Sequence, residues 1–301
     1  KAIYYFTHAS NQNNQKAQYF LGEIYYHGKY VSVDIKKSIF YLTLASNQNN
    51  MYAQYLLGEI YYLGQKIPRD INKSIYFLTL SANQNYSSAQ NLLGKIYIDV
   101  KKDFDKAIHY LTQSADQNNP VSQCSLGAIF SDKNNHLFNI NKSIYYLTLS
   151  ANQNFSDAQY LLGELFYEGV YVPRDINKSL HYLELASKQN NHESQYLLGC
   201  IFYEGKYVER NVEKSIDYLT LSANKFNSNA QYLLGEIYYK YSNDIDKSLH
   251  YLNFSSNQNN INANYLLGKI YINILKGPKN IEKGINYLIL ASNSGNYLAS
   301  S

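Results

Sequence analysis

The chain has 301 residues, of which 45% are hydrophobic and 17% are charged, so it is long enough to bury a large core. Its 27 basic and 23 acidic residues give a net charge of +4, which excludes the basic belt that nucleic-acid binders show. Two cysteines imply no disulfide framework, and no apolar run is long enough to span a bilayer. We therefore expect a cytoplasmic protein, in a reducing compartment, that binds neither nucleic acid nor membrane.

Residues 1–13 have the pattern of one helix, and the rest of the chain repeats a two-helix unit. A glycine in the first half marks each unit and recurs in steps of 36, 36, 33, 36, 36, 36 and 33 residues, at Gly22, Gly58, Gly94, Gly127, Gly163, Gly199, Gly235 and Gly268. A fixed period of this size is typical of stacked-repeat arrays. We therefore predict a single array over residues 1–301, which begins in the second helix of one repeat.

The stretch from Asn50 to Asn85 shows what one unit contains. Asn50 can cap a first helix, and Gly64 can end it in a left-handed conformation, as can Gly169 and Gly205 in two other units. Between these ends, apolar residues recur at the spacing of one helical face: Ala53, Leu56, Leu57, Ile60 and Tyr61.

The second helix of that stretch is predicted to begin at Asp70 and to close on Gln84-Asn85. Asp or Asn holds the capping position in every unit: Asp34, Asp70, Asp103, Asn139, Asp175, Asn211, Asp244 and Asn280. Asn is the best non-glycine residue for a left-handed end, and it recurs there as Asn13, Asn49, Asn118, Asn154, Asn190 and Asn259, with Gly295 last.

A glycine in the middle of a helix, such as Gly58, costs about 1 kcal/mol relative to alanine. Eight such glycines indicate that a neighbouring helix approaches closely at each of them. A bulky aromatic residue three positions on is expected to fill the adjacent space, as Tyr61 does after Gly58. Because one hairpin cannot bury such a face alone, successive hairpins must stack.

Four places are expected to depart from this regularity. The 33-residue steps indicate shorter loops between the two helices, at residues 99–102 and 240–243, and Lys225-Phe226 replaces the Gln-Asn end. The unit of Gly127 lacks the aromatic pair and the glycine that end other first helices. The last residues, from Asn296 to Ala299, look like the opening of another first helix, so we expect the chain to be a fragment of a longer protein.

The repeated pattern resembles Sel1-like repeats, which are relatives of tetratricopeptide repeats. The residues that carry the resemblance are Ala-x-x-Leu-Leu-Gly-x-Ile-Tyr-Tyr-x-Gly, the capping Asp, Lys-Ser-Ile-x-Tyr-Leu and the closing Ala-Ser-x-Gln-Asn, seen best from Ala158 to Asn190. The chain departs from the family at Tyr41, Tyr146 and Tyr182, where Trp is usual. The resemblance implies an all-α fold, a right-handed αα-superhelix (solenoid) of about eight repeats, which serves as a scaffold or adaptor in protein complexes.

A second set of residues lies off the buried face of the first helices, at i, i+4 and i+7. We call this set the tyrosine stripe: Tyr19, Glu23, Tyr26, Tyr55, Glu59, Tyr62, Tyr160, Glu164, Tyr167, Tyr196, Tyr203, Tyr232, Glu236 and Tyr239, with Cys200 in the acidic position of one repeat. By resemblance, these positions line the concave surface and would bind a partner protein or peptide. Alternatively, the rings pack only between neighbouring first helices. A variable column is the better candidate for specificity: Lys16, Tyr52, Ser88, Val121, Asp157, Glu193, Asn229 and Asn262.

A lysine column occupies the first turn of the second helices, at Lys37, Lys73, Lys106, Lys142, Lys178, Lys214, Lys247 and Lys283. The helix dipole disfavours a cation there. One interpretation is an acidic partner along that edge. We favour the other, in which each lysine stem lies over an aromatic ring with its ammonium group near the capping acid.

The sequence shows no catalytic constellation, no metal-ligand spacing and no phosphate-binding loop, so no enzymatic activity, metal or cofactor is expected. The favoured function is a non-enzymatic scaffold. The alternatives are a regulatory or recruiting arm of a larger enzyme, for example a kinase, and a structural component of a large assembly. RNA recognition by one repeat per base is disfavoured by the balanced charge.

Overall fold

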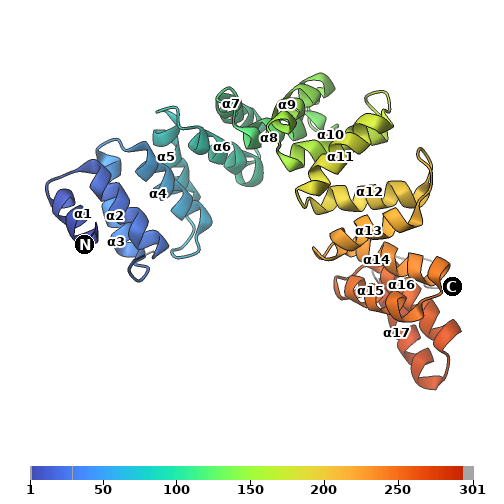
Figure 1. Ribbon diagram of the computed structural model, residues 1–301. Coiled ribbons are helices and arrows are strands. Elements are labelled where there is room, and N and C mark those ends of the chain that lie inside the picture. The colour runs from blue at the N-terminus through green and yellow to red at the C-terminus, as the bar shows by residue number, and fades with distance from the viewer. Residues whose placement is uncertain (1, 29, 294–301) are drawn as a thin grey trace. The chain divides into compact units, whose positions relative to one another are not determined.

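The computed structural model describes residues 2–28 and 30–293, and these residues form helices without any strand. The chain divides into two compact units, 1–153 and 154–301, which are described separately below. Within each unit, successive helices run back and forth and pack against their neighbours in sequence (Figure 1).

Each repeat is one helical hairpin. The first helices are α2 (Gln15–His27), α4 (Met51–Leu63), α6 (Ser87–Ile96) and α8 (Pro120–Ser131) in the first unit, and α10 (Ser156–Glu168), α12 (His192–Glu204), α14 (Ser228–Ile237) and α16 (Ile261–Ile270) in the second. The second helices are α1 (Ala2–Asn11), α3 (Ile35–Asn47), α5 (Ile71–Ala82), α7 (Phe104–Ala115), α9 (Ile140–Asn152), α11 (Ile176–Lys188), α13 (Val212–Ala223), α15 (Ile245–Asn257) and α17 (Pro278–Asn293). The predicted fold class, an all-α solenoid of about eight two-helix repeats, is confirmed.

The helices begin where the sequence predicts because side-chain caps satisfy their free amides. Asn50 Oδ1 accepts from the Ala53 amide at 2.9 Å, and Asp70 Oδ1 accepts from the Lys73 amide at 3.0 Å. The same bond caps the second helices that follow Asp34, Asp103, Asn139, Asp175, Asn211 and Asp244.

Asn280 was predicted to cap the last second helix, and this prediction is wrong. The helix α17 already begins at Pro278, whose fixed φ and missing N–H suit the first helical position. Asn280 therefore lies inside the first turn, and its amide donates backwards to the carbonyls of Leu275 and Lys276.

The predicted left-handed helix ends are confirmed at Gly64, Gly169 and Gly205, where φ is 63°, 65° and 65°. The Asn column also has positive φ, between 60° and 65°, at Asn13, Asn49, Asn85, Asn118, Asn154, Asn190 and Asn259. Phe226 keeps the same backbone with φ of 63°, although a bulky side chain is strained there. Gly295 lies outside the described residues.

The two short steps of the repeat have shorter connections, as predicted: residues 102–103 and 243–244 join the helices, whereas residues 64–70 join α4 to α5. Part of the segment predicted as loop is helical, because the first helix continues into a five-residue π-helix, η1 (Tyr97–Lys101) or η2 (Tyr238–Ser242), which ends at a left-handed Lys102 or Asn243. A third π-helix, η3 (Tyr271–Leu275), follows α16. The wider turn lets the chain reverse directly into the next helix with three residues fewer.

Each mid-helix glycine of a first helix lies against a leucine side chain of the second helix in its own hairpin. A Cβ atom built on Gly58 would lie 2.5 Å from Cγ of Leu78 in the second helix of the same hairpin, and one on Gly163 would lie 2.6 Å from Cγ of Leu183. Three residues beyond Gly58, the Tyr61 ring stacks on Phe77 with centroids 6.0 Å apart. The glycine therefore allows the two helices of a hairpin to close, as predicted.

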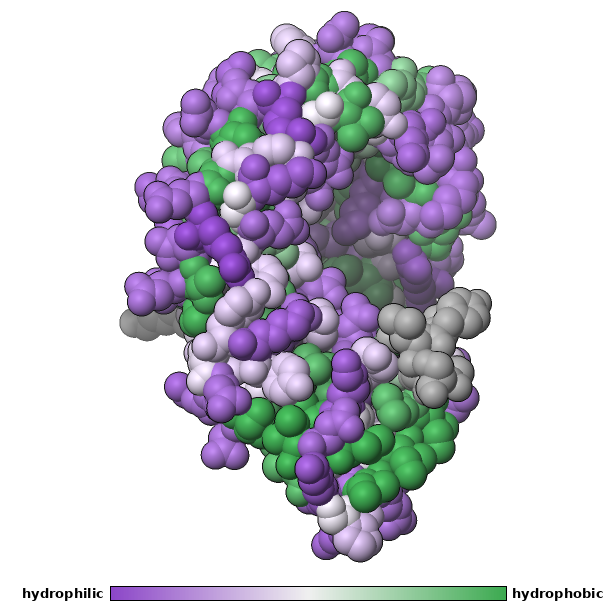
Figure 2. Space-filling view, turned by 90° about the vertical axis from the view of Figure 1, so that its right-hand side faces the viewer, coloured by the Kyte–Doolittle hydropathy of each residue, from purple (hydrophilic) through white to green (hydrophobic). Residues whose placement is uncertain are grey.

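Successive hairpins share their cores. The cluster around Leu78 in α5 includes Leu93 of α6, the first helix of the next repeat, and partly buried Ile71 and Ile75 pack on it. The last second helix has no such cover among the described residues: Ile281, Ile285 and Ile289 of α17 are 40%, 47% and 51% exposed. Figure 2 shows an apolar surface at the lower end of the view, where α17 lies in Figure 1.

A pair of glutamines closes six of the hairpins at their base, which the sequence analysis did not foresee. Gln84, just after α5, donates its Nε2 to Gln54 Oε1 near the start of α4 at 2.7 Å. We call this contact the amide clasp, and it recurs as Gln48–Gln18, Gln117–Gln90, Gln153–Gln123, Gln189–Gln159 and Gln258–Gln231. In the α12–α13 hairpin, Lys225 takes the donor's place, and the buried Oε1 of Gln195 has no hydrogen-bond partner. The α12–α13 hairpin therefore lacks the amide clasp at Lys225 and has Phe226 in place of asparagine at its left-handed end.

Replacing Gly163 with alanine should destabilise the protein, because the new methyl group collides with Leu183. We expect a loss of about 1–3 kcal/mol in the free energy of unfolding, measured by denaturant titration. In a Leu183→Ala background the same change should instead be neutral or stabilising, since only the gain in helix propensity of about 1 kcal/mol remains. Equal costs in both backgrounds would contradict the close contact.

Lys225→Gln should stabilise the protein by about 1 kcal/mol, because it supplies the missing donor to Gln195. The measurement is the shift of the chemical-denaturation midpoint. Lys225→Met is the matched control: it removes the same charge but donates no hydrogen bond, so it should leave the midpoint nearly unchanged. A gain of the same size from methionine would show that the charge of Lys225, and not the unpaired carbonyl, limits stability.

Candidate functional site

The residues of the tyrosine stripe lie where the sequence placed them, on one face of the first helices. Within each unit these helices contact the first helix of the next repeat, as α10 contacts α12 and α12 contacts α14. All the predicted site residues are partly exposed, and none is fully buried.

The stripe rings also take part in packing between repeats. Tyr55 and Tyr62 of α4 pack against the core cluster formed by α5 and α6. Tyr160 and Tyr167 of α10 pack in the same way on the cluster that contains Leu198 of α12. Each ring therefore contributes one face to repeat stacking and leaves the remainder, with the neighbouring carboxylates, at the surface.

Tyrosine and glutamate of the stripe form hydrogen-bonded pairs one helical turn apart. The hydroxyl donates to the carboxylate at 3.2 Å in Tyr55–Glu59 and at 2.6 Å in Tyr160–Glu164. Burial, with the charge of Glu23 as the next cause, raises the pKa of Tyr19 to about 12. Burial also raises the pKa of the Glu164 carboxyl, and the hydrogen bond from Tyr160 opposes this rise. The pairs hold each ring in one orientation and leave acceptor positions on the carboxylate.

The second unit carries the stripe on three successive first helices, α10, α12 and α14. Tyr167 of α10 donates to Glu204 of α12 at 3.2 Å, which joins two of these helices across their surface. The helices α10 and α12 carry five acidic residues and no Lys or Arg, namely Asp157, Glu164, Glu168, Glu193 and Glu204. Basic residues reach the stripe from outside these two helices, as Arg210 does over the Tyr203 ring and Lys240 at Glu236. This surface is both aromatic and acidic.

In the first unit the stripe is present on α2 and α4 and absent from α6 and α8. The sequence analysis did not state this difference between the two halves of the chain. The corresponding residues are Asn91, Lys95 and Ile98 after α4, and then Cys124, Ala128 and Ser131 of α8. The signal was present in the sequence, because aligning every repeat on its glycine reveals these exchanges. The stripe is therefore longest in the second unit.

The variable column is exposed, as a specificity position requires. Tyr52 and Val121 are 45% and 41% exposed, and Lys16, Asp157, Glu193, Asn229 and Asn262 are also exposed, whereas Ser88 is partly buried. The column runs beside the stripe near the start of each first helix. Its charge changes from Lys16 in the first unit to Asp157 and Glu193 in the second.

The lysine column has the structural role that we favoured. Each ammonium nitrogen lies 4.0–5.5 Å from the centroid of an aromatic ring on the first helix of its own hairpin, as Lys73 does over Tyr61 and Lys214 over Phe202. Where the cap is an aspartate, the lysine also pairs with it, for example Lys178 with Asp175 at 3.3 Å. These contacts offset the unfavourable helix dipole.

The described residues contain no cluster of three or more His, Cys, Asp or Glu side chains that could hold a metal ion. Both cysteines are free thiols, and burial raises the pKa of Cys200 to about 11. Among the helices of residues 2–28 and 30–293, none combines the length and the apolar character needed to cross a bilayer.

Hairpins of two short helices, closed on a glycine and stacked side by side, define an αα-repeat protein of the tetratricopeptide type. The sequence model of the Sel1 repeat matches residues 15–50, 52–86, 87–119, 137–155, 156–191, 192–225, 228–260 and 261–296. The chain therefore belongs to the Sel1 repeat family. Proteins built from these repeats are generally non-catalytic scaffolds for protein interactions.

Solved structures agree with this assignment. One is a protective antigen present in uropathogenic Escherichia coli strains, displaying an SLR fold, at 25% identity and a TM-score of 0.79 over 98% of this chain. This chain spans 64% of the length of that protein. Another is a Sel1 repeat protein from Oxalobacter formigenes, at 23% identity and a TM-score of 0.78, with 99% of this chain and 89% of that one covered. No curated protein matches the sequence significantly.

Replacing a stripe tyrosine should separate its packing role from its surface role. Tyr160→Ala removes the half-buried ring and should cost about 1–3 kcal/mol of unfolding free energy, less than a fully buried aromatic. Tyr160→Phe keeps the ring and loses only the bond to Glu164, so it should cost less than about 1.5 kcal/mol. Thermal and urea denaturation measure both, with Tyr145→Ala, at a 60% exposed ring, as the near-neutral control. A neutral Tyr160→Ala would refute the packing contact.

Proposed function

We propose that this chain is a non-enzymatic scaffold that holds a partner protein or peptide on its first-helix face, the side predicted to be concave. The observation that carries the proposal is the uninterrupted stripe on α10, α12 and α14. Three neighbouring first helices there present half-exposed rings in register, and each ring is fixed by packing on the next repeat. A preformed surface of this kind loses little conformational freedom on binding.

Tyrosine rings suit a protein interface because they are large, stiff and polar at one end. On α10 and α12 they lie among acidic side chains with no basic residue on the same helices. Such a surface favours a partner that presents Lys or Arg side chains, which pair with carboxylates and stack on rings. The same negative charge repels the phosphates of a nucleic acid.

The fold supports the same reading. Sel1-repeat proteins are generally interaction scaffolds, and the solenoid exposes one continuous row of first helices within each unit. The extent of the stripe indicates that the second unit makes the larger contribution. Glu193 and the other members of the variable column would then select among partners.

The experiment is site-specific photo-cross-linking in the organism's own extract. A benzoylphenylalanine at Tyr196, in the centre of the stripe, should capture a partner that mass spectrometry identifies. The control places the same group at His181, which is exposed on the second helix α11. Capture from His181 with equal yield, or none from Tyr196, would contradict binding on the first-helix face.

The charge of the interface can be tested with the partner so identified. Glu193→Lys and Glu204→Lys change two exposed acids and should weaken binding about tenfold or more, as measured by calorimetry. Asp217→Lys, at an exposed position on α13, is the matched control and should leave the affinity unchanged. Equal losses from all three variants would show a general effect of net charge.

A further inference from the structure

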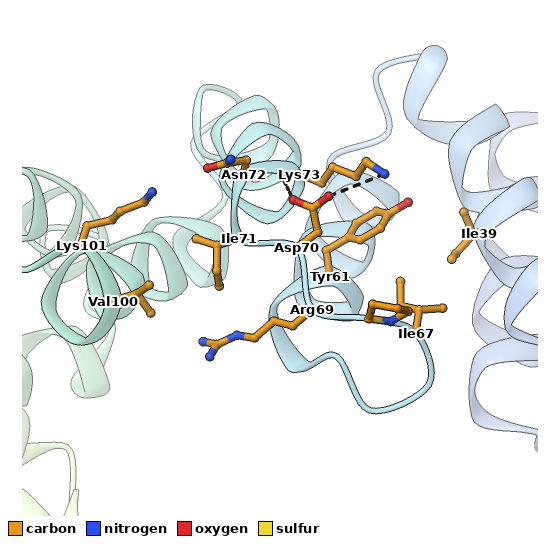
Figure 3. A pocket seen from close by; sticks show the side chains of 11 residues that line it. Ile39, Tyr61, Ile67, Arg69, Asp70, Ile71, Asn72, Lys73, Val100 and Lys101 are labelled. Carbon is orange, nitrogen blue, oxygen red and sulfur yellow. Dashed lines mark hydrogen bonds and ion pairs between the residues drawn. The ribbon is translucent and has the colours of Figure 1, made fainter.

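The first unit contains an open cavity of about 750 Å³ that is separate from the tyrosine stripe (Figure 3). It lies between the loop that joins α4 to α5 and the π-helix η1 of the next repeat. Ile67, Arg69 and Ile71 line it from the loop side, and Val100 and Lys101 line it from η1. No part of the proposed scaffold function uses these residues.

Two of the cations in this cavity are unpaired. Arg69 and Lys101 form no hydrogen bond or ion pair with any of the described residues, whereas their neighbour Lys73 pairs with Asp70 at 3.6 Å. In Figure 3 the Arg69 side chain extends from the loop toward the segment that carries Val100 and Lys101. The Tyr62 ring, 4.8 Å from its guanidinium carbon, supports the arginine from behind.

The second unit shows the same position with its space filled. Arg210 holds the same repeat position as Arg69, and Tyr241 of η2 holds the position of Val100, because 31 residues separate the two partners in both units. The Arg210 Nε donates to the Tyr203 carbonyl at 2.9 Å, and its guanidinium carbon lies 4.7 Å from the centre of the Tyr241 ring. In the first unit, Val100 stands in place of this tyrosine. The space stays open, and the Arg69 guanidinium has no hydrogen-bond partner among the described residues.

The lining determines the chemistry of a ligand. Its only acidic residue, Asp70, is engaged as a helix cap and by Lys73, so the free charges are positive. The remaining wall is mainly aliphatic, with Ile71 and Val100 on the side of Arg69 and Ile39 and Ile67 on the other, and it also includes the Tyr61 ring and Asn72. The planar fork of an arginine matches a carboxylate with two hydrogen bonds, and Lys101 adds a second positive charge.

We propose that this cavity binds a peptide segment that carries a carboxylate beside an aliphatic side chain. Arg69 and Lys101 hold the carboxylate, and the aliphatic group lies against Ile71 and Val100, which are on the same side of the loop as the Arg69 guanidinium in Figure 3. The site is a second point of attachment for a protein partner. It can be tested apart from the stripe on α10, α12 and α14, because it lies in the first unit and its free charges are positive.

The test is an NMR titration of the whole chain with its Ile and Val methyl groups labelled. The probe is N-acetyl-L-leucine, which places a carboxylate next to an isobutyl group. It should shift the methyl signals of Ile71 and Val100 in a saturable way, with a dissociation constant on the order of 1 mM for so small a ligand. N-acetyl-L-leucinamide, which lacks the charge, should bind at least about tenfold more weakly. Inorganic phosphate shifting these signals as strongly as the probe would overturn the peptide assignment.

Two substitutions locate the binding. Val100→Tyr rebuilds the arrangement of Arg210 and Tyr241, so it should fill the cavity and abolish the shifts without lowering the melting temperature. Arg69→Gln should weaken binding at least about tenfold, whereas Arg210→Gln is the matched control and should change nothing. Lys101→Gln, at an exposed residue, repeats the test if Arg69→Gln affects folding. Undiminished binding by Val100→Tyr would overturn the proposal.

Discussion

The close contact between a glycine backbone and a leucine side chain is the constraint on which every hairpin depends. A leucine such as Leu78 occupies the space that a Cβ atom at Gly58 would need, so the two helices approach closely at one fixed point. That point sets the register of the hairpin. It brings the aromatic ring three residues later against a ring of the second helix, and it places the lysine of the second helix over the same stack.

Because each hairpin exposes an apolar flank, its stability comes from its neighbours. The side chains of the first-helix face therefore also contribute to the packing between repeats. Tyr55 and Tyr160 show this most clearly, since each packs on the next repeat while its hydroxyl is held by a glutamate at the surface. The arrangement fixes the rings before any ligand arrives, and it couples changes in the binding face to changes in stability.

Much of this architecture could be predicted, because the period, the capping Asp or Asn and the mid-helix glycine each follow from local rules. The errors occurred where two rules competed. Pro278 started a helix earlier than Asn280 could cap it, and a π-helix took up residues that were predicted to be loop. The stripe residues were placed on the correct face from helical spacing alone, but their division between packing and surface depends on the angle between repeats, which no local pattern encodes.

The cavity beside Arg69 could not be read from a single repeat, because it exists only by contrast with Tyr241 in another one. The amide clasp was missed for a related reason. Its two glutamines are 30 residues apart in Gln54–Gln84, and either one alone looks like an ordinary polar residue near a helix end. In this array, a feature such as the cavity or the clasp is visible only when equivalent positions of different repeats are compared.

Primary amides close the hairpins, cap the first helices and form the left-handed turns, and this choice of chemistry sets a thermal limit on the molecule. Asn and Gln are thermolabile, and prolonged heat converts them to acids. A Gln84 changed to glutamate would lose its donor and place a carboxylate against the carbonyl oxygen of Gln54, so that attraction becomes repulsion. Since the same pair recurs along the array, slow hydrolysis of these amides would remove a stabilising hydrogen bond from several hairpins at once.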